Sequence, residues 1–181
     1  YGFNGGSVLS ADPGAVSLVF VTTSMGAAAG AISAFVTAYL MFKSYDHSML
    51  LNGILGGLVG ITAGADVITP MEAIIIGAVA GILIPFAVVF FDILKLDDPV
   101  GATSVHLVCG IWGTLAAGIF GEGKDVVAQL TGIAAIGAFT FAFSFLLFYI
   151  LKITVGIRVP DTEEERGLDI TEHEMEAYKM F

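Results

Sequence analysis

Long apolar stretches alternate with short polar ones along most of the chain. Stretches with few or no charged residues cover residues 15–42, 48–62, 71–94, 99–120 and 126–155. All but the second reach the roughly 20 residues that a helix needs to cross the hydrocarbon core of a bilayer. The pattern predicts five transmembrane helices within residues 14–156. Residues 1–13 are expected to form a helix end and a loop, and residues 157–181 a polar tail.

Composition supports an all-α membrane protein, a bundle of several transmembrane helices. Hydrophobic residues make up 56% of the chain and charged residues only 13%, whereas a soluble domain of ordinary composition carries about 25% charged residues. The net charge is -10, but roughly half of the 17 acidic residues lie in residues 161–176. The acidity belongs largely to the tail, and the chain has no basic patch on which nucleic-acid binding could rest.

The short second segment is counted as a helix because it keeps the basic residues on consistent sides of the membrane. With five transmembrane segments, the tail shares one side with the loops that hold Lys43 and Lys95. That side then holds every basic residue of the 7 except Lys124. Basic residues gather on the cytoplasmic side, so we expect a multi-pass protein of the cell membrane with a cytoplasmic C-terminus.

Glycines recur at four-residue spacing in the first three segments. In a membrane, close contact between helix backbones depends on small residues at such positions. The repetition predicts a compact bundle rather than a single anchor. The pairs are Gly26 with Gly30, Gly53 with Gly57, Gly56 with Gly60, and Gly77 with Gly81.

One histidine, His106, lies inside an otherwise apolar segment. A titratable residue at that depth is a functional hypothesis by default, and desolvation favours its neutral form. A neutral imidazole offers one donor and one acceptor nitrogen, so it could pass a proton or hold a small polar solute. The alternative is a core histidine bonded to a neighbouring carbonyl.

The residues around His106 have structural interpretations. Asp97 and Asp98 precede Pro99, as an acidic cap precedes a proline in a first helical turn, and we expect one of them to be a cap. Cys109 follows His106 by three residues, so the two could share a helix face, but two ligands do not close a metal site. Packing or a place in a pore wall is the favoured interpretation of Cys109.

Phe3 and Ser7 share a helix face if residues 1–7 are helical. An aromatic ring attracts a cation, and a hydroxyl accepts a hydrogen bond, although interface packing explains the pair equally well. The sequence has no phosphate-binding loop, nucleophile elbow or zinc-protease motif. We therefore expect no catalytic residues, metal or cofactor, and no enzyme.

Five segments in order resemble the ammonium transporter family. The resemblance covers essentially all 181 residues and is carried by YGFNGGS at 1–7, NGILGGLVGIT at 52–62, LDDPVGATSVHLVCGIWG at 96–113, GIRVP at 156–160 and GLDITEHEMEAY at 167–178. It is a resemblance to the C-terminal half of an eleven-span fold with inverted repeats that assembles as a homotrimer. Because the chain begins without Met, we interpret it as a segment of a longer protein.

The resemblance implies a role for each of several residues. His106 is similar to the second member of a histidine pair in the pore, Phe3 to one of two stacked phenylalanines, and Ser7 to the hydroxyl of an outer ammonium site. Asp97, Asp98 and Cys109 would be structural near the pore. A regulatory tail that contacts neighbouring subunits and a PII-type protein would include Gly167, Asp169, His173 and Tyr178.

The implied function is transport of ammonium or ammonia through a hydrophobic pore. The alternative is an ammonium sensor with the same fold. Family sensors usually carry an extra signalling domain, and none follows Phe181, which favours transport. The sequence departs from the family pattern at Gly101, where many members have an acid, at Trp112, where many have a small aliphatic residue, and at Glu174, where many have glycine.

Overall fold

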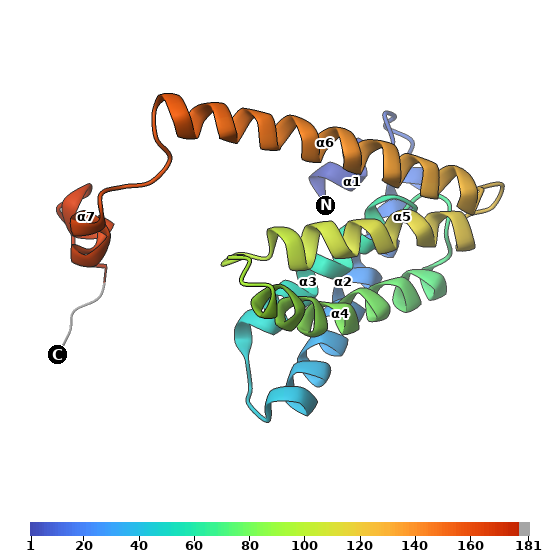
Figure 1. The fold of residues 1–181 in the computed structure, drawn as a ribbon. Helices are drawn as coiled ribbons and strands as arrows, with labels where there is room; N and C mark the ends of the chain where they lie inside the picture. The colour runs from blue at the N-terminus through green and yellow to red at the C-terminus, as the bar shows by residue number, and fades with distance from the viewer. Residues whose placement is uncertain (178–181) are drawn as a thin grey trace. The chain divides into compact units, whose positions relative to one another are not determined.

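The computed structural model describes residues 1–177, and every regular element within them is helical. The elements are α1 (Gly2–Gly6), α2 (Pro13–Phe42), α3 (His47–Thr62), α4 (Pro70–Ile93), the π-helix η1 (Ala102–Leu107), α5 (Val108–Phe120), α6 (Val126–Thr154), α7 (Asp161–Arg166) and α8 (Leu168–Thr171) (Figure 1). The structure thus confirms the all-helical fold class.

Within the described part, four helices are long and apolar enough to cross a membrane. They are α2, α4, the continuous helix η1–α5 over Ala102–Phe120, and α6. The helix α3 has 16 residues, which corresponds to about 24 Å at 1.5 Å per residue. Since the hydrocarbon core is about 30 Å thick, α3 does not reach across it alone, and the five-segment count stays a prediction.

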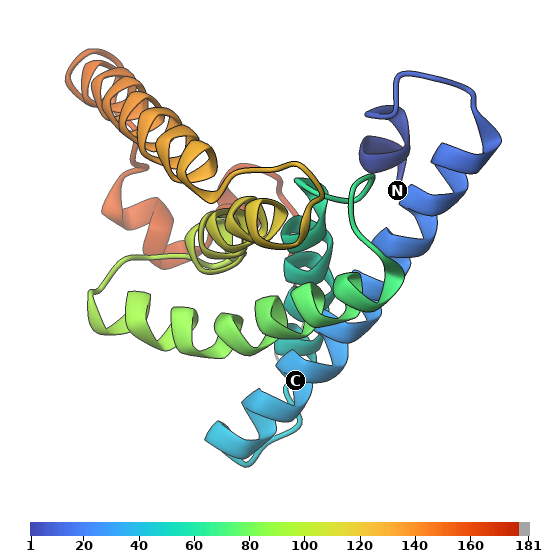
Figure 2. The same ribbon diagram turned by 90° about the vertical axis from the view of Figure 1, so that its right-hand side faces the viewer.

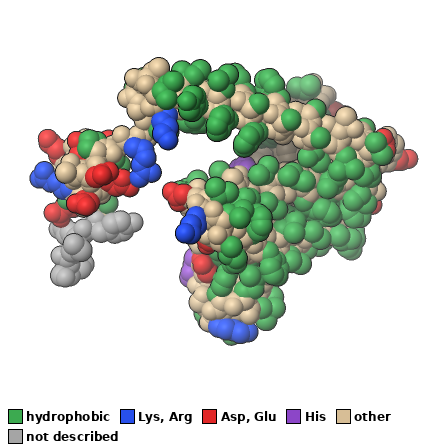
Figure 3. Space-filling model, viewed as in Figure 1, with side chains coloured by type: hydrophobic (Ala, Val, Ile, Leu, Met, Phe, Trp, Pro, Cys, Tyr) green, Lys and Arg blue, Asp and Glu red, His purple; other side chains and the backbone are tan. Residues whose placement is uncertain are grey.

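The chain divides into two units, residues 1–134 and residues 135 onward, with the boundary inside α6. The first unit contains α1 to α5 and all of the buried core. On the face seen in Figure 3, hydrophobic side chains cover most of its surface, and the charged side chains gather near the helix ends. An apolar surface of this kind suits contact with lipid or with other membrane helices.

The helices α2, α3 and α4 pack through their glycines (Figures 1 and 2). A Cβ atom on Gly57 would overlap the carbonyl oxygen of Gly26 and would lie 3.0 Å from the Cα of Ala27. Gly30 and Gly77 are equally close to backbone atoms of a neighbouring helix. The structure therefore confirms that the regularly spaced glycines bring the helix backbones into contact.

Each long helix of the first unit begins with a side chain that accepts hydrogen bonds from its free N–H groups. Asp12 Oδ1 accepts from Ala15 N at 2.7 Å, and Asp46 Oδ1 from Ser48 N at 2.8 Å. Thr69 and Glu72 form a reciprocal capping box at α4. These caps fix where each helix starts and so set its register in the bundle.

Candidate functional site

A cavity of about 460 Å³ opens between α1, α3 and the helix η1–α5 of the first unit. Its wall includes Phe3 and His106, two residues that the sequence analysis singled out and that lie far apart in the sequence. The other residues are apolar or small, apart from two threonines. The lining residues are Phe3, Val59, Thr62, Ala63, His106, Gly110 and Thr114.

The backbone around His106 is a π-helix rather than the expected α-helix. The backbone N–H of His106 donates to the carbonyl oxygen of Gly101, five residues earlier, at 3.1 Å. The Val105 N–H donates to the same oxygen at 3.0 Å. The Nδ1 atom of His106 lies 3.5 Å from that oxygen. Short π-helical turns in longer helices are frequent at functional sites, and here the turn coincides with the singled-out histidine.

This helix begins at Ala102, three residues later than expected, because the left-handed backbone of Gly101 separates it from the preceding turn. Gly101 has φ +79°, and a Cβ there would lie 2.6 Å from Val105 Cγ2. Glycine is the residue that adopts such a conformation without steric cost. Pro99 therefore lies in the preceding turn and not in the first turn of the helix.

Asp98 is the cap of this helix start. Its Oδ1 accepts from Ala102 N at 2.6 Å, while Oδ2 accepts from the backbone N of Thr103 at 3.1 Å and from Ser104 N at 2.8 Å. The Ser104 hydroxyl also donates to Oδ2, at 2.7 Å. Burial alone would raise the pKa of Asp98, but the hydrogen bonds from Ser104 and Thr103 outweigh it and hold the pKa well below its usual range.

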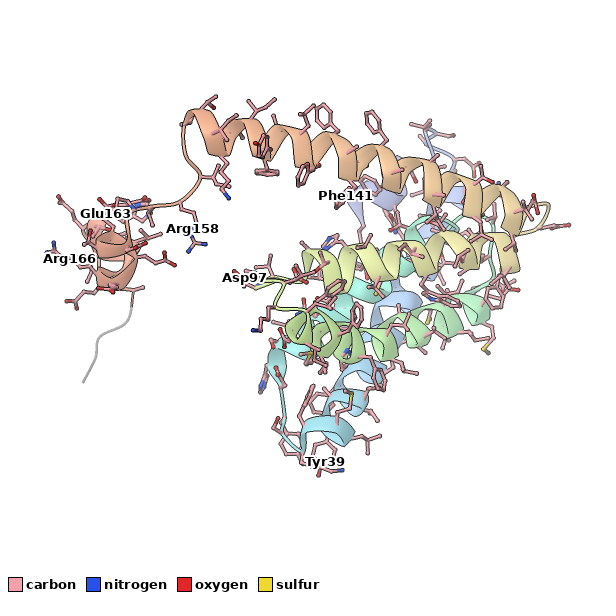
Figure 4. The ribbon with its side chains drawn as sticks, in the orientation of Figure 1. Tyr39, Asp97, Phe141, Arg158, Glu163 and Arg166 are labelled. Carbon is pink, nitrogen blue, oxygen red and sulfur yellow. The ribbon has the colours of Figure 1, made fainter. Side chains whose placement is uncertain are left out.

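Asp97 and Cys109 lie outside the cavity wall. Asp97 is exposed at the end of the bundle where η1 begins (Figure 4). Cys109 is buried against α4, where its Sγ donates to the carbonyl oxygen of Ala80 at 3.6 Å. The expectation that Cys109 and His106 could share a face is wrong, because the π turn and α5 direct the two residues to different neighbours.

Ser7 does not line the cavity either. Ser7 is the C-terminal cap of α1, and its backbone N–H donates to the carbonyl oxygen of Phe3 at 3.0 Å, so it lies one helical turn beyond Phe3 without reaching the cavity wall. The Ser7 hydroxyl donates to the carbonyl oxygen of Asn4 at 2.7 Å. Its lone pairs stay available as acceptors at the exposed end of the chain.

Asn4 is a site residue that sequence reasoning missed. It is only 5% exposed, and its Nδ2 donates to Thr23 Oγ1 on α2 at 3.1 Å. The Tyr1 hydroxyl donates to Ser24 Oγ at 3.1 Å, which ties the same short helix to α2 a second time. These bonds position α1, and with it Phe3, over the cavity. One indication of this role was present in the sequence, the polar amide of Asn4 in a glycine-rich apolar segment.

The tail residues belong to the second unit. Gly167 has φ +97°, and the Asp169 carboxylate accepts from Ala177 N at 2.8 Å. Glu174 has φ 51°, in the left-handed region that favours glycine. His173 is exposed, and Tyr178 lies outside the described residues. Arg158 and Glu164 form an ion pair at 2.9 Å in the tail region of Figure 4, which labels Arg158.

Several apolar helices of membrane-spanning length, with an open cavity at the surface of the bundle whose wall holds one histidine, define a helical membrane protein of several spans. The model of the Ammonium Transporter Family matches residues 1–178, and the chain belongs to that family. This result agrees with the resemblance found in the sequence. No group of three or more His, Cys, Asp or Glu side chains placed to hold a metal occurs within residues 1–177.

Relatives and solved structures agree with this assignment. A protein from Synechocystis sp. is 42% identical over 96% of this chain and 41% of its own length. Ammonium transporter Amt2 of Archaeoglobus fulgidus is 39% identical over 100% of this chain and 43% of its own length. The structure of a protein titled Sensor Amt Protein has a TM-score of 0.89 and 37% identity, over 94% of this chain and 45% of its own. The chain thus spans less than half the length of these proteins.

Proposed function

We propose that the whole protein moves ammonium across the cell membrane as ammonia, through a pore whose wall includes the His106 cavity. The observation that carries this proposal is the cavity itself, because Phe3 and His106 meet in one apolar wall. Family membership supports the choice of substrate. The relatives named as transporters agree with the expectation that the protein is not an enzyme.

The mechanism follows from the cost of moving a charge through an apolar cavity. A bare ammonium ion loses its hydration there at a large free-energy cost, so it gives up a proton before it enters. The Phe3 ring and the Ser7 hydroxyl hold the cation at the outer end by cation–π attraction and a hydrogen bond. Ammonia then passes His106, and the proton follows a separate route along His106 and a second imidazole from elsewhere in the full protein.

The same proposal covers the surroundings of the pore. The chain is the C-terminal half of the protein, with its tail in the cytoplasm, where all the basic residues except Lys124 then lie. The full protein assembles as a homotrimer in the bilayer. A PII-type regulatory protein contacts the cytoplasmic face, where the tail contributes Gly167, Asp169, His173 and Tyr178.

The test is an ammonium-evoked current. Full-length protein is reconstituted in liposomes, adsorbed on a solid-supported membrane and exposed to pulses of ammonium, with potassium pulses and empty liposomes as controls. The proposal predicts a saturable inward charge displacement with ammonium alone. Equal responses to potassium, or no response beyond that of empty liposomes, would contradict it.

A sensor is the second candidate function. It is supported by the likeness to the protein titled Sensor Amt Protein, at 37% identity and a TM-score of 0.89. A sensor would bind ammonium without turnover. The same preparation separates the two functions, because a sensor gives an ammonium-dependent change in thermal stability but no sustained charge displacement.

A further inference from the structure

The continuous helix η1–α5 presents two different faces, and only one of them reaches the cavity. His106, Gly110 and Thr114 repeat every four residues and line the cavity, as residues on one side of a helix do. Cys109 and Trp112 lie on the other side, against the buried clusters formed with α3 and α4. The direction in which His106 points therefore depends on how α5 is rotated about its own axis.

Two hydrogen bonds tie this second face to α4. The indole Nε1 of Trp112 donates to the carbonyl oxygen of Ile76 at 2.9 Å. One turn earlier, Cys109 Sγ donates to the carbonyl oxygen of Ala80 at 3.6 Å. The later donor on α5 bonds to the earlier acceptor on α4, so the two helices are antiparallel (Figure 1). They are joined by hydrogen bonds at two points along their length. A single attachment would leave α5 free to turn about it, whereas two restrict the turn.

The third side of α5 is closed by α3. A Cβ on Gly113 would overlap the carbonyl oxygen of Gly60, so the two backbones touch. The indole Cδ1 of Trp112 is also 3.7 Å from the Cβ position of Gly60. Trp112 thus lies between α3 and α4. Its ring fills the space between these helices, and its N–H fixes the rotation of α5 about its own axis.

We propose that Trp112 is a positioning residue that sets the rotation of α5 and so directs His106 into the cavity. Its effect on transport rests on the proposed function, but its effect on the rotation of α5 does not. The indole N–H carries this role more than the bulk of the ring. A phenylalanine would fill most of the same space and leave the Ile76 carbonyl without its cross-helix donor.

Cys109 reports the rotation independently of transport. In the full protein with every other cysteine replaced by serine, the buried Cys109 thiol should resist a small methanethiosulfonate reagent. In Trp112→Phe it should react about tenfold faster or more, because a rotated α5 carries Cys109 toward the cavity. Tyr39→Phe is the matched control, since it also removes a polar group from an aromatic ring and should leave labelling unchanged. Equal labelling of Trp112→Phe and wild type would overturn the proposal.

Transport kinetics give the second readout. In Trp112→Phe the maximal ammonium current per assembled protein should fall about tenfold to a hundredfold, the scale that a misplacement of about 1 Å produces. The KM for ammonium should stay unchanged, because Phe3 lies on α1 and Ser7 is the C-terminal cap of that helix, so neither belongs to α5. An unchanged maximal current would overturn the proposal, whereas no current in wild type would count against the proposed function alone.

A measurement on the wild type covers the case in which Trp112→Phe does not assemble. The wild-type protein is labelled with ¹⁵N-tryptophan, and its indole N–H resonances are compared with those of a Trp112→Leu variant. The resonance that is missing from the variant belongs to Trp112. If Trp112→Leu does not fold either, segmental labelling of the wild type assigns the resonance. The proposal predicts slow hydrogen exchange at that N–H. Exchange at the rate of a free indole would overturn it.

Discussion

At the residue scale, the place of His106 depends on two features of the segment just before it. The Asp98 carboxylate collects three backbone N–H groups and one hydroxyl. Gly101, at φ +79°, turns the chain so that its carbonyl oxygen accepts from both Val105 and His106. Together they start the helix in a π turn, and that turn determines where the imidazole lies.

Replacing Asp98 with alanine should destabilise the protein by about 1–2 kcal/mol at neutral pH, the usual cost of losing a helix cap. The pKa of Asp98 is lowered in the folded protein, so its contribution is complete above the unfolded value of about 3.9. It is lost as pH falls through the folded pKa. Thermal melting in detergent should therefore show a constant gap between wild type and variant down to about pH 4.

Asp97→Ala is the control for this prediction, because Asp97 is exposed beside the same helix start. Its melting temperature should match that of wild type. If Asp97→Ala and Asp98→Ala lost the same stability, loss of the helix cap would not explain the destabilisation of Asp98→Ala.

Several of these residues were predictable because their chemistry is local. An acidic residue just before an apolar run predicts a cap, as Asp98 did. A histidine inside such a run predicts a site, and His106 lies in the cavity wall, while its function stays a prediction. The contacts of Asn4 with Thr23 and of Trp112 with Ile76 join distant parts of the chain. No periodicity in one sequence reports such pairs, so the structure was needed to find them.

At the scale of elements, backbone contact between α2, α3 and α4 holds the first unit together. The helix α3 is too short to span a bilayer alone, yet it touches α2 through Gly53 and Gly57 and touches α5 through Gly60. The glycine spacing predicted this contact. The π turn was not predictable, because the residues of η1 are equally compatible with an α-helix.

Gly57→Ala should separate α2 from α3, because the added Cβ would overlap the backbone carbonyl of Gly26. Backbone atoms yield less readily than a flexible side chain, and overpacking of this kind costs about 1–3 kcal/mol. The measurement is the melting temperature of the purified full-length protein. Gly132→Ala is the matched control, since a Cβ there meets nothing within 4 Å and helical alanine is favoured over glycine by up to about 1 kcal/mol. Equal melting of the two variants would contradict this account of the packing.

At the scale of the whole molecule, the chain lines a cavity with its own residues and belongs to a family whose compared members are more than twice its length. The sequence was sufficient to predict the membrane class and the family resemblance, because hydrophobic length and five ordered motifs are properties of the sequence itself. Which residues share the cavity depended on the packing of α1 and α5. Hence Phe3 was found in the wall, while Ser7 and Cys109 were not.

If ammonium transport depends on His106, a second histidine of the chain is its matched control, because His47 is exposed at the start of α3. The decisive measurement is the ammonium-evoked current on a solid-supported membrane for wild type, His47→Ala and His106→Ala, each normalised to the amount of assembled protein. We expect full current in His47→Ala and none in His106→Ala, because His106 lies in the cavity wall and His47 does not. A His106→Ala current equal to that of wild type would contradict it.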